Sequence, residues 1–123
     1  MTDYKFYNHN PDGNRISDCV SRAIGTATGL SYKAVNRLLS QVAEKYDCDK
    51  LCVCCYKHLL SHFLGYKKYV CKSGTLVKYV LEDFSDFVLI IRIEGHLTCA
   101  KNGVLFDTWD CTDREADCFW IVS

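Results

Sequence analysis

Residues 87–109, with the sequence FVLIIRIEGHLTCAKNGVLFDTW, carry the clearest β pattern in the chain. The stretch opens on an apolar run interrupted only by Arg92, which is typical of a buried strand. Asn102-Gly103 predicts a two-residue hairpin, because a type I′ turn needs positive φ at both central residues. A further apolar segment lies near the C-terminus. We therefore expect four strands, over 87–93, 96–101, 104–109 and 119–122.

The residues before this stretch show helical spacing instead. Gly29 is suited to end a first helix in a left-handed conformation, and Ser31 is suited to cap a second one. Four helices are expected, over about 19–27, 31–46, 50–63 and 75–81, although periodicity alone leaves a strand open for the last. Helices followed by antiparallel strands in 123 residues predict a single α+β domain, with N-terminal helices packed on a C-terminal antiparallel sheet.

Composition narrows the classes of function. Apolar residues make up 49% of the chain and charged residues 24%, as in folded globular proteins. Fifteen basic residues balance fifteen acidic ones, so the sequence predicts neither nucleic-acid nor membrane-surface binding. Apolar runs are far shorter than the roughly 20 residues of a membrane span. The start of the chain does not resemble a signal peptide, so we expect a cytoplasmic protein.

This expected location bears on the cysteines. In a reducing compartment, an odd number of cysteines in a chain with a sizeable core indicates free thiols and not a disulfide framework. The question is then which thiol carries chemistry. The nine cysteines are at positions 19, 48, 52, 54, 55, 71, 99, 111 and 118.

The predicted hairpin places a histidine next to an acid. If Asn102 and Gly103 form the loop, cross-strand partners have numbers that sum to 205, and His96 and Asp107 become diagonal neighbours on one face. Diagonal Cβ atoms are about 7 Å apart, within reach of an imidazole and a carboxylate. Asp107 could then fix the tautomer of His96 and stabilise its cation.

The thiol that fits this pair is Cys19. Its expected place is the first turn of a helix, where the helix dipole and free N–H groups favour a thiolate. The neighbouring Asp18 opposes this effect, and Arg22 can offset Asp18. The backbone N–H of Cys19 is available to bind an oxyanion, and Asn14 in the preceding loop can add a side-chain amide.

These residues form an ordered pattern: Asn14, Asp18-Cys19-Val-Ser-Arg-Ala at a helix start, Gly95-His96 on one strand and Gly103 to Asp107 on the next. The pattern resembles the papain-like cysteine peptidase superfamily, and is most similar to compact bacterial and phage members such as the bacteriocin-processing double-glycine peptidases. The resemblance implies a papain-like core, with Cys19 as nucleophile, His96 as base and Asp107 as the orienting residue. Asn14 would stand in the oxyanion hole, where the family commonly has a glutamine.

The sequence therefore predicts a small cytoplasmic cysteine hydrolase, a peptidase or amidase that acts on a protein or peptide through an acyl-enzyme. This chemistry uses no cofactor and no metal. A non-catalytic bacterial or phage interaction protein on the same fold is the alternative, because a fold does not determine a function.

A third hypothesis is a zinc-binding module. Spacings of three and four residues place pairs of metal-binding side chains on one face of the helix expected at 50–63. Cys52 and Cys55 share that face with Leu59 and Phe63, as residues of a hydrophobic core would, and no second Cys-x-x-Cys pair occurs elsewhere. The candidate ligands are Cys48, Cys52, Cys54, Cys55, His58 and His62.

Overall fold

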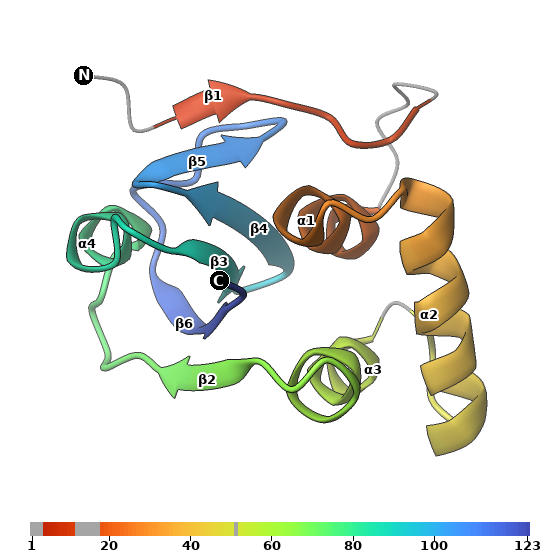
Figure 1. Cartoon of the computed structure of the whole chain (residues 1–123). Helices are drawn as coiled ribbons and strands as arrows, with labels where there is room; N and C mark the ends of the chain where they lie inside the picture. Colours follow the sequence, from red (N-terminus) through yellow and green to blue (C-terminus); the bar gives the residue numbers. More distant parts are fainter. Residues whose placement is uncertain (1–3, 12–17, 51) are drawn as a thin grey trace.

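The computed structural model describes residues 4–11, 18–50 and 52–123, and it has the expected α+β architecture (Figure 1). The described helices are α1 (Cys19–Thr28), α2 (Tyr32–Tyr46), α3 (Val53–His58) and α4 (Val77–Asp83). The described strands are β1 (Tyr4–Phe6), β2 (Lys67–Val70), β3 (Val88–Ile93), β4 (His96–Lys101), β5 (Val104–Asp107) and β6 (Ala116–Ile121). They form one sheet in the order β1-β5-β4-β3-β6-β2, in which β1 pairs parallel to β5 and the other described pairs are antiparallel.

Local signals explain where several elements begin and end. Asn102 and Gly103 have φ values of 52° and 79°, as a type I′ turn requires, and Lys101 pairs with Val104 across the hairpin. Gly29, with φ 79°, ends α1, and its N–H donates to the Gly25 carbonyl. The Ser31 hydroxyl accepts a hydrogen bond from the backbone N–H of Ala34 at 3.1 Å and caps α2.

Helices cover both faces of the sheet. The α1, α2 and α3 helices lie on one side in Figure 1, and α4 lies on the other. Successive strand residues point to opposite faces of the sheet. Ile90 therefore packs in the core on the side of α1, α2 and α3, whereas Leu89 and Ile91 pack in the core on the side of α4. This is why β3 is apolar at successive positions: it is a central strand buried on both faces.

The third helix begins later than predicted and changes character. Cys52 lies just before α3, and its sulfur accepts the N–H of Cys55 at 3.4 Å, so a thiol takes the place of the usual hydroxyl cap. The helix continues as a π-helical segment over Leu59–Phe63. There the N–H of Leu64 donates to the carbonyl of Leu59, five residues earlier, at 2.9 Å.

Two strands were missed by the sequence analysis because they are short edge strands without an apolar alternation. β1 is largely exposed, and β2 contains two lysines on the opposite edge. The last strand begins at Ala116, before the predicted start at Phe119. The fourth helix is observed as a helix, at Val77–Asp83, which resolves the ambiguity between helix and strand.

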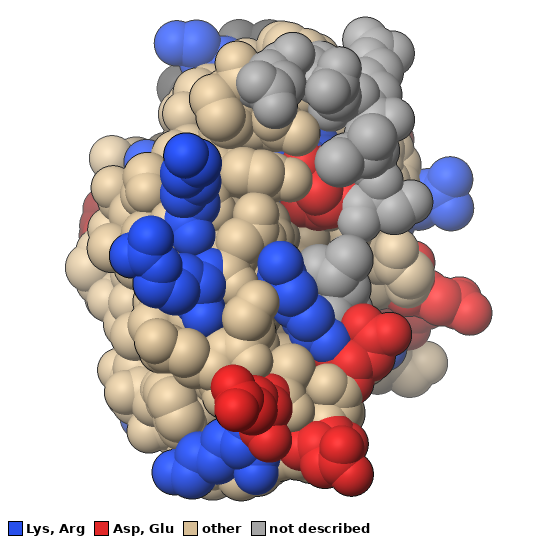
Figure 2. Space-filling model, turned by 90° about the vertical axis from the view of Figure 1, so that its right-hand side faces the viewer, with Lys and Arg blue, Asp and Glu red and all other residues tan. Residues whose placement is uncertain are grey.

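Among the described residues, no helix combines the length and apolar character that crossing a membrane requires. Figure 2 shows the face on the side of α2, where basic and acidic side chains both reach the surface. On this face neither sign of charge forms a continuous field, in line with a formal net charge of zero.

Candidate active site

Cys19 and His96 lie close together where α1 and β4 begin. Cys19 is the first residue of α1, which lies beside β4, and His96 is the first residue of β4 (Figure 1). The Cys19 thiol lies beside the His96 side chain and the backbone of Leu97, and both favour its ionised form. The sequence placed both residues at these element starts, and the structure adds the contact between them.

A divergence of two strands makes room for this contact. The pairing of β4 with β5 stops at Cys99 and Phe106, although β4 continues to His96. Beyond that pair, β4 remains paired with β3, and the backbone of Leu97 favours the ionised form of the Cys19 thiol.

His96 also contacts Asp107, as the hairpin register predicts. His96 Nε2 lies 2.6 Å from Asp107 Oδ2, and both side chains are largely buried. Because Nε2 is engaged by Asp107, Nδ1 is the ring nitrogen left for the thiol. The other carboxylate oxygen of Asp107 accepts the N–H of Thr108 at 2.6 Å, so the acid is held from two sides.

The electrostatics of the three groups favour an ion pair. Burial opposes ionisation of Cys19, but hydrogen bonds from His96 and Leu97 and the His96 charge hold the pKa of the thiol below its ordinary value. Burial also opposes the His96 cation, but hydrogen bonds with Asp107 and Cys19 raise its pKa to about 9. Despite burial, the hydrogen bond with His96 keeps the pKa of Asp107 low. Thiolate, imidazolium and carboxylate thus stabilise one another.

The charge of Asp18 is balanced by a largely buried ion pair with Arg22. Its carboxylate is bound by Arg22 Nε at 2.7 Å, by the Tyr32 hydroxyl at 2.9 Å and by the Asn10 amide at 3.0 Å. Arg22 also donates to the Thr108 hydroxyl at 2.8 Å and lies 3.6 Å from Asp107. Arg22 therefore offsets Asp18, as expected, and links it to the end of β5.

Asp18 makes no side-chain hydrogen bond to the first turn of α1, although it occupies the N-cap position. Its carboxylate is used for tertiary contacts, and it leaves the N–H groups at the start of α1 uncapped by this side chain. The oxyanion role of Asn14 is untested, because Asn14 lies outside the described residues.

A cavity of about 160 Å³ opens beside the thiol. Tyr56 and Arg92 form its polar side, where Arg92 Nε donates to the Tyr56 hydroxyl at 2.9 Å and Arg92 forms an ion pair with Asp117. The ring of Trp109 packs against His96 at a centroid distance of 5.1 Å. The cavity is lined by Cys19, Val20, Val53, Tyr56, Arg92, Gly95, His96 and Leu97.

Cys111 lies next to the site. Its sulfur, a ring nitrogen of His96 and a carboxylate oxygen of Asp107 lie within 4.8 Å of one another, which is close enough for a metal ion. Burial and the Asp107 charge raise the pKa of Cys111 to about 12, so its thiol is neutral. Because His96 is cationic and engaged by Asp107, this group is better suited to proton transfer than to metal binding.

The cysteine-rich segment is only partly a core element. Cys55 and Leu59 are fully buried, and the Cys55 thiol donates to the Leu39 carbonyl at 3.4 Å, as the core interpretation predicts. That interpretation is wrong for Phe63, which is 42% exposed, because the π-helical segment shifts its direction. Cys52 is partly buried and packs against the core, and its sulfur also lies 2.8 Å from that of Cys54.

Comparisons with protein-family models, with curated proteins and with solved structures found no match for this chain.

Proposed function

We propose that this protein is a cysteine hydrolase, a peptidase or amidase, with Cys19 as nucleophile, His96 as general base and acid, and Asp107 as the residue that orients His96. One observation carries the proposal: the His96 imidazole interacts electrostatically with the Cys19 thiol, beside it in the same cavity, and lies 2.6 Å from the buried Asp107 carboxylate. This is the set of contacts that activates a nucleophile. The papain-like resemblance supports the same three roles.

In the proposed acylation, the Cys19 thiolate attacks the carbonyl carbon of the substrate and forms a C–S bond. The oxyanion accepts hydrogen bonds from N–H groups at the start of α1, which Asp18 leaves uncapped. The C–N bond then breaks as His96 gives its proton to the leaving amine. In deacylation, His96 takes a proton from water, the hydroxide attacks the thioester carbon, and the C–S bond breaks to release a carboxylic acid and restore the thiolate.

The expected substrate is a protein or peptide with a small side chain at the scissile residue. The cavity beside Cys19, about 160 Å³, has room for one small group. Val20, Val53 and Leu97 make its apolar wall, and the Tyr56 hydroxyl and Arg92 guanidinium form its polar side. This arrangement suits a short aliphatic side chain next to a carbonyl or carboxylate group of the substrate.

The first test is alkylation of the reduced native protein by iodoacetamide from pH 5 to 9, with each cysteine quantified by peptide mass spectrometry. We expect Cys19 to react fastest near neutral pH, with an apparent pKa below the ordinary value of about 8.5. Cys71 is the matched internal control, because it is also partly buried and burial raises its pKa.

If Cys19 reacts no faster than Cys71 across this range, the thiolate is absent and the hydrolase proposal fails. The same fold would then have to serve a non-catalytic role, and a Cys19→Ala variant would keep its biological effect. If Cys19 is selectively alkylated, the acyl-enzyme can be sought with p-nitrophenyl acetate and fluorogenic peptide amides.

A further inference from the structure

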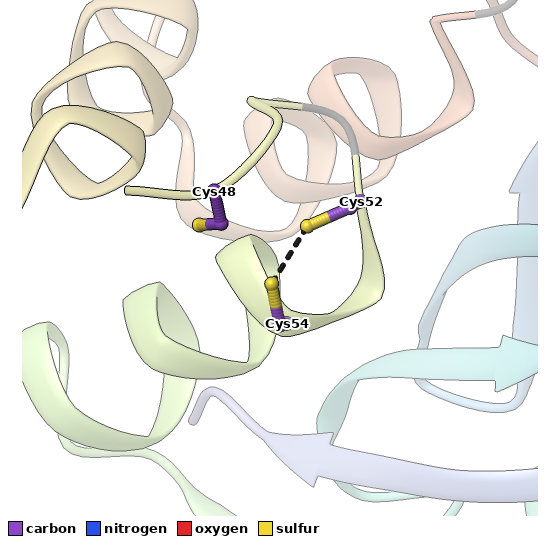
Figure 3. Close-up of side chains that lie close together, drawn as sticks. All are labelled: Cys48, Cys52 and Cys54. Carbon is purple, nitrogen blue, oxygen red and sulfur yellow. Dashed lines mark hydrogen bonds between the residues drawn. The ribbon is translucent and has the colours of Figure 1, made fainter. Parts of the chain in front are cut away.

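Three thiols converge at the turn between α2 and α3, away from the candidate active site. Cys48 lies in the segment after α2, Cys52 immediately precedes α3, and Cys54 lies in the first turn of α3. Figure 3 shows the sulfurs of Cys52 and Cys54 directed toward each other, with the Cys48 side chain beside them. The three sulfur atoms lie within 4.8 Å of one another, and those of Cys52 and Cys54 are 2.8 Å apart.

These distances are close to those around a tetrahedral zinc ion. With Zn–S bonds of about 2.3 Å, two sulfurs of a tetrahedral site lie about 3.8 Å apart. Cys52 and Cys54, at 2.8 Å, would separate by about 1 Å to accept the ion. Rotation of exposed Cys54 about its side-chain bond is sufficient for a movement of this size.

The candidate for a fourth ligand is His58, on the same helix as Cys54, whose ring nitrogens lie outside the group formed by the three sulfurs and would have to move toward it. His58 follows Cys54 by four residues, so the two side chains lie on one helical face. The Nδ1 atom of His58 is buried and has no hydrogen-bond partner among the described residues. The ring stacks on Tyr46 with a centroid distance of 4.0 Å, which holds it beside the end of α2. A buried nitrogen without a partner is costly unless it binds something.

We propose that Cys48, Cys52, Cys54 and His58 bind one zinc ion. The ion would join the segment after α2 to the start of α3, and exposed Cys54 provides its route of entry. Soft thiolates and one imidazole are a donor set that zinc prefers, and four protein ligands form a closed, structural site. Val53, between two of the ligands, lines the cavity beside Cys19, so the ion would also hold one wall of that cavity.

The experiment is a titration of the reduced full-length Cys19→Ala variant with Co²⁺, followed by Zn²⁺, monitored by absorption. Cobalt reports thiolate ligation by charge-transfer bands and tetrahedral geometry by intense d–d bands. We expect one equivalent of Co²⁺ to bind and zinc to displace it. Cys54→Ser should weaken binding by at least about a hundredfold, since even second-shell changes cost tenfold to a hundredfold. Cys71→Ser, the matched control, should leave binding unchanged.

His58→Gln should weaken the d–d bands while the thiolate charge-transfer bands remain. The proposal is overturned if no charge-transfer band forms, or if Cys54→Ser leaves the bands intact. It is also overturned if the bands disappear in His96→Gln, which would place the ion at His96, Asp107 and Cys111. A Cys52–Cys54 disulfide that persists in reductant would indicate a redox pair instead. Because Cys19 is absent from this background, none of these results depends on hydrolase activity.

Discussion

The Cys19 site and the cluster of Cys48, Cys52 and Cys54 differ in what surrounds each sulfur. Cys19 faces an imidazole that Asp107 holds in its cationic form, and despite burial the pKa of Cys19 is lowered. Cys48, Cys52 and Cys54 face one another instead. The hydrogen bond with Cys52 raises the pKa of Cys54 to about 12, although Cys54 is exposed.

This difference shows that exposure alone does not make a cysteine reactive. A thiolate persists near neutral pH only when positive charge or hydrogen-bond donors stabilise it. His96 supplies both to Cys19. In the cysteine cluster of residues 48, 52 and 54 the same role would fall to a metal ion, which removes the protons from the thiols that bind it.

The largest expected difference between the Cys19 site and the cluster of Cys48, Cys52 and Cys54 is the effect of substitution on the rate of hydrolysis. Cys19→Ala should reduce the hydrolysis of p-nitrophenyl acetate and peptide amides by at least about a thousandfold, because removal of a nucleophile abolishes the covalent route. Cys54→Ala should leave the rate within about twofold, since Cys54 does not line the cavity. Equal losses in the two variants, with both folded by circular dichroism, would contradict the assignment of Cys19.

Removing the charge of Asp107 should weaken the thiolate without deleting it. In Asp107→Asn, the pKa of His96 should fall from about 9 toward its ordinary value of 6.5. Alkylation of Cys19 at pH 7 should then slow by about tenfold, since one pKa unit is a tenfold change in population.

Asp110→Asn is the matched control for this substitution. Asp110 accepts hydrogen bonds from Thr112 and has no contact with His96 among those observed. Alkylation at Cys54 should be unchanged in both variants. An Asp107→Asn protein with a wild-type alkylation rate at Cys19 would show that the imidazolium does not need the carboxylate.

The pH dependence separates attack from proton donation. His96 has a raised pKa of about 9, so it keeps its proton below that pH and loses it above. Hydrolysis of a peptide amide should therefore fall to half its maximum at about pH 9, because His96 no longer protonates the leaving amine. Alkylation of Cys19 should not fall over the same range, because it needs only the thiolate. Parallel decreases in the two rates would remove the general-acid role of His96.

The smallest effect is expected at Cys111, a buried neighbour of Asp107 whose thiol is neutral. Cys111→Ala should lower the free energy of unfolding by about 1 kcal/mol, a typical loss for a small change in a core. It should leave the pH profile of Cys19 alkylation unchanged. Urea denaturation and alkylation measure the two quantities, with Cys71→Ala as a less buried control. A shifted alkylation profile would instead make Cys111 part of the proton network.

Much of the candidate site followed from one short turn. Asn102-Gly103 set the register of the hairpin, and the alternation of strand residues then predicted that His96 and Asp107 share a face. Both steps depend on neighbours in the chain, because turn type and strand pleat follow from backbone sterics. The helix that begins at Cys19 was also predicted from local signals, since Gly29 ends this helix and Ser31 caps the next one.

Other features carried no local signal. The short strands β1 and β2 are held by pairing with β5 and β6, and not by any apolar pattern of their own. The sequence also did not predict that α4 packs on the second face of the sheet. The apolar face of a helix can be read from its periodicity, but the face of the sheet that the helix covers cannot.

The sequence by itself determined the α+β class, the hairpin and the pairing of His96 with Asp107, because these depend on periodicity and on a two-residue loop. Only the tertiary structure decided that Cys19 meets His96, that Arg22 joins Asp18 to the end of β5, and that three cysteines converge after α2. Such contacts depend on how α1 and α3 pack against the rest of the core, and this packing is set by the summed burial of residues from the whole chain.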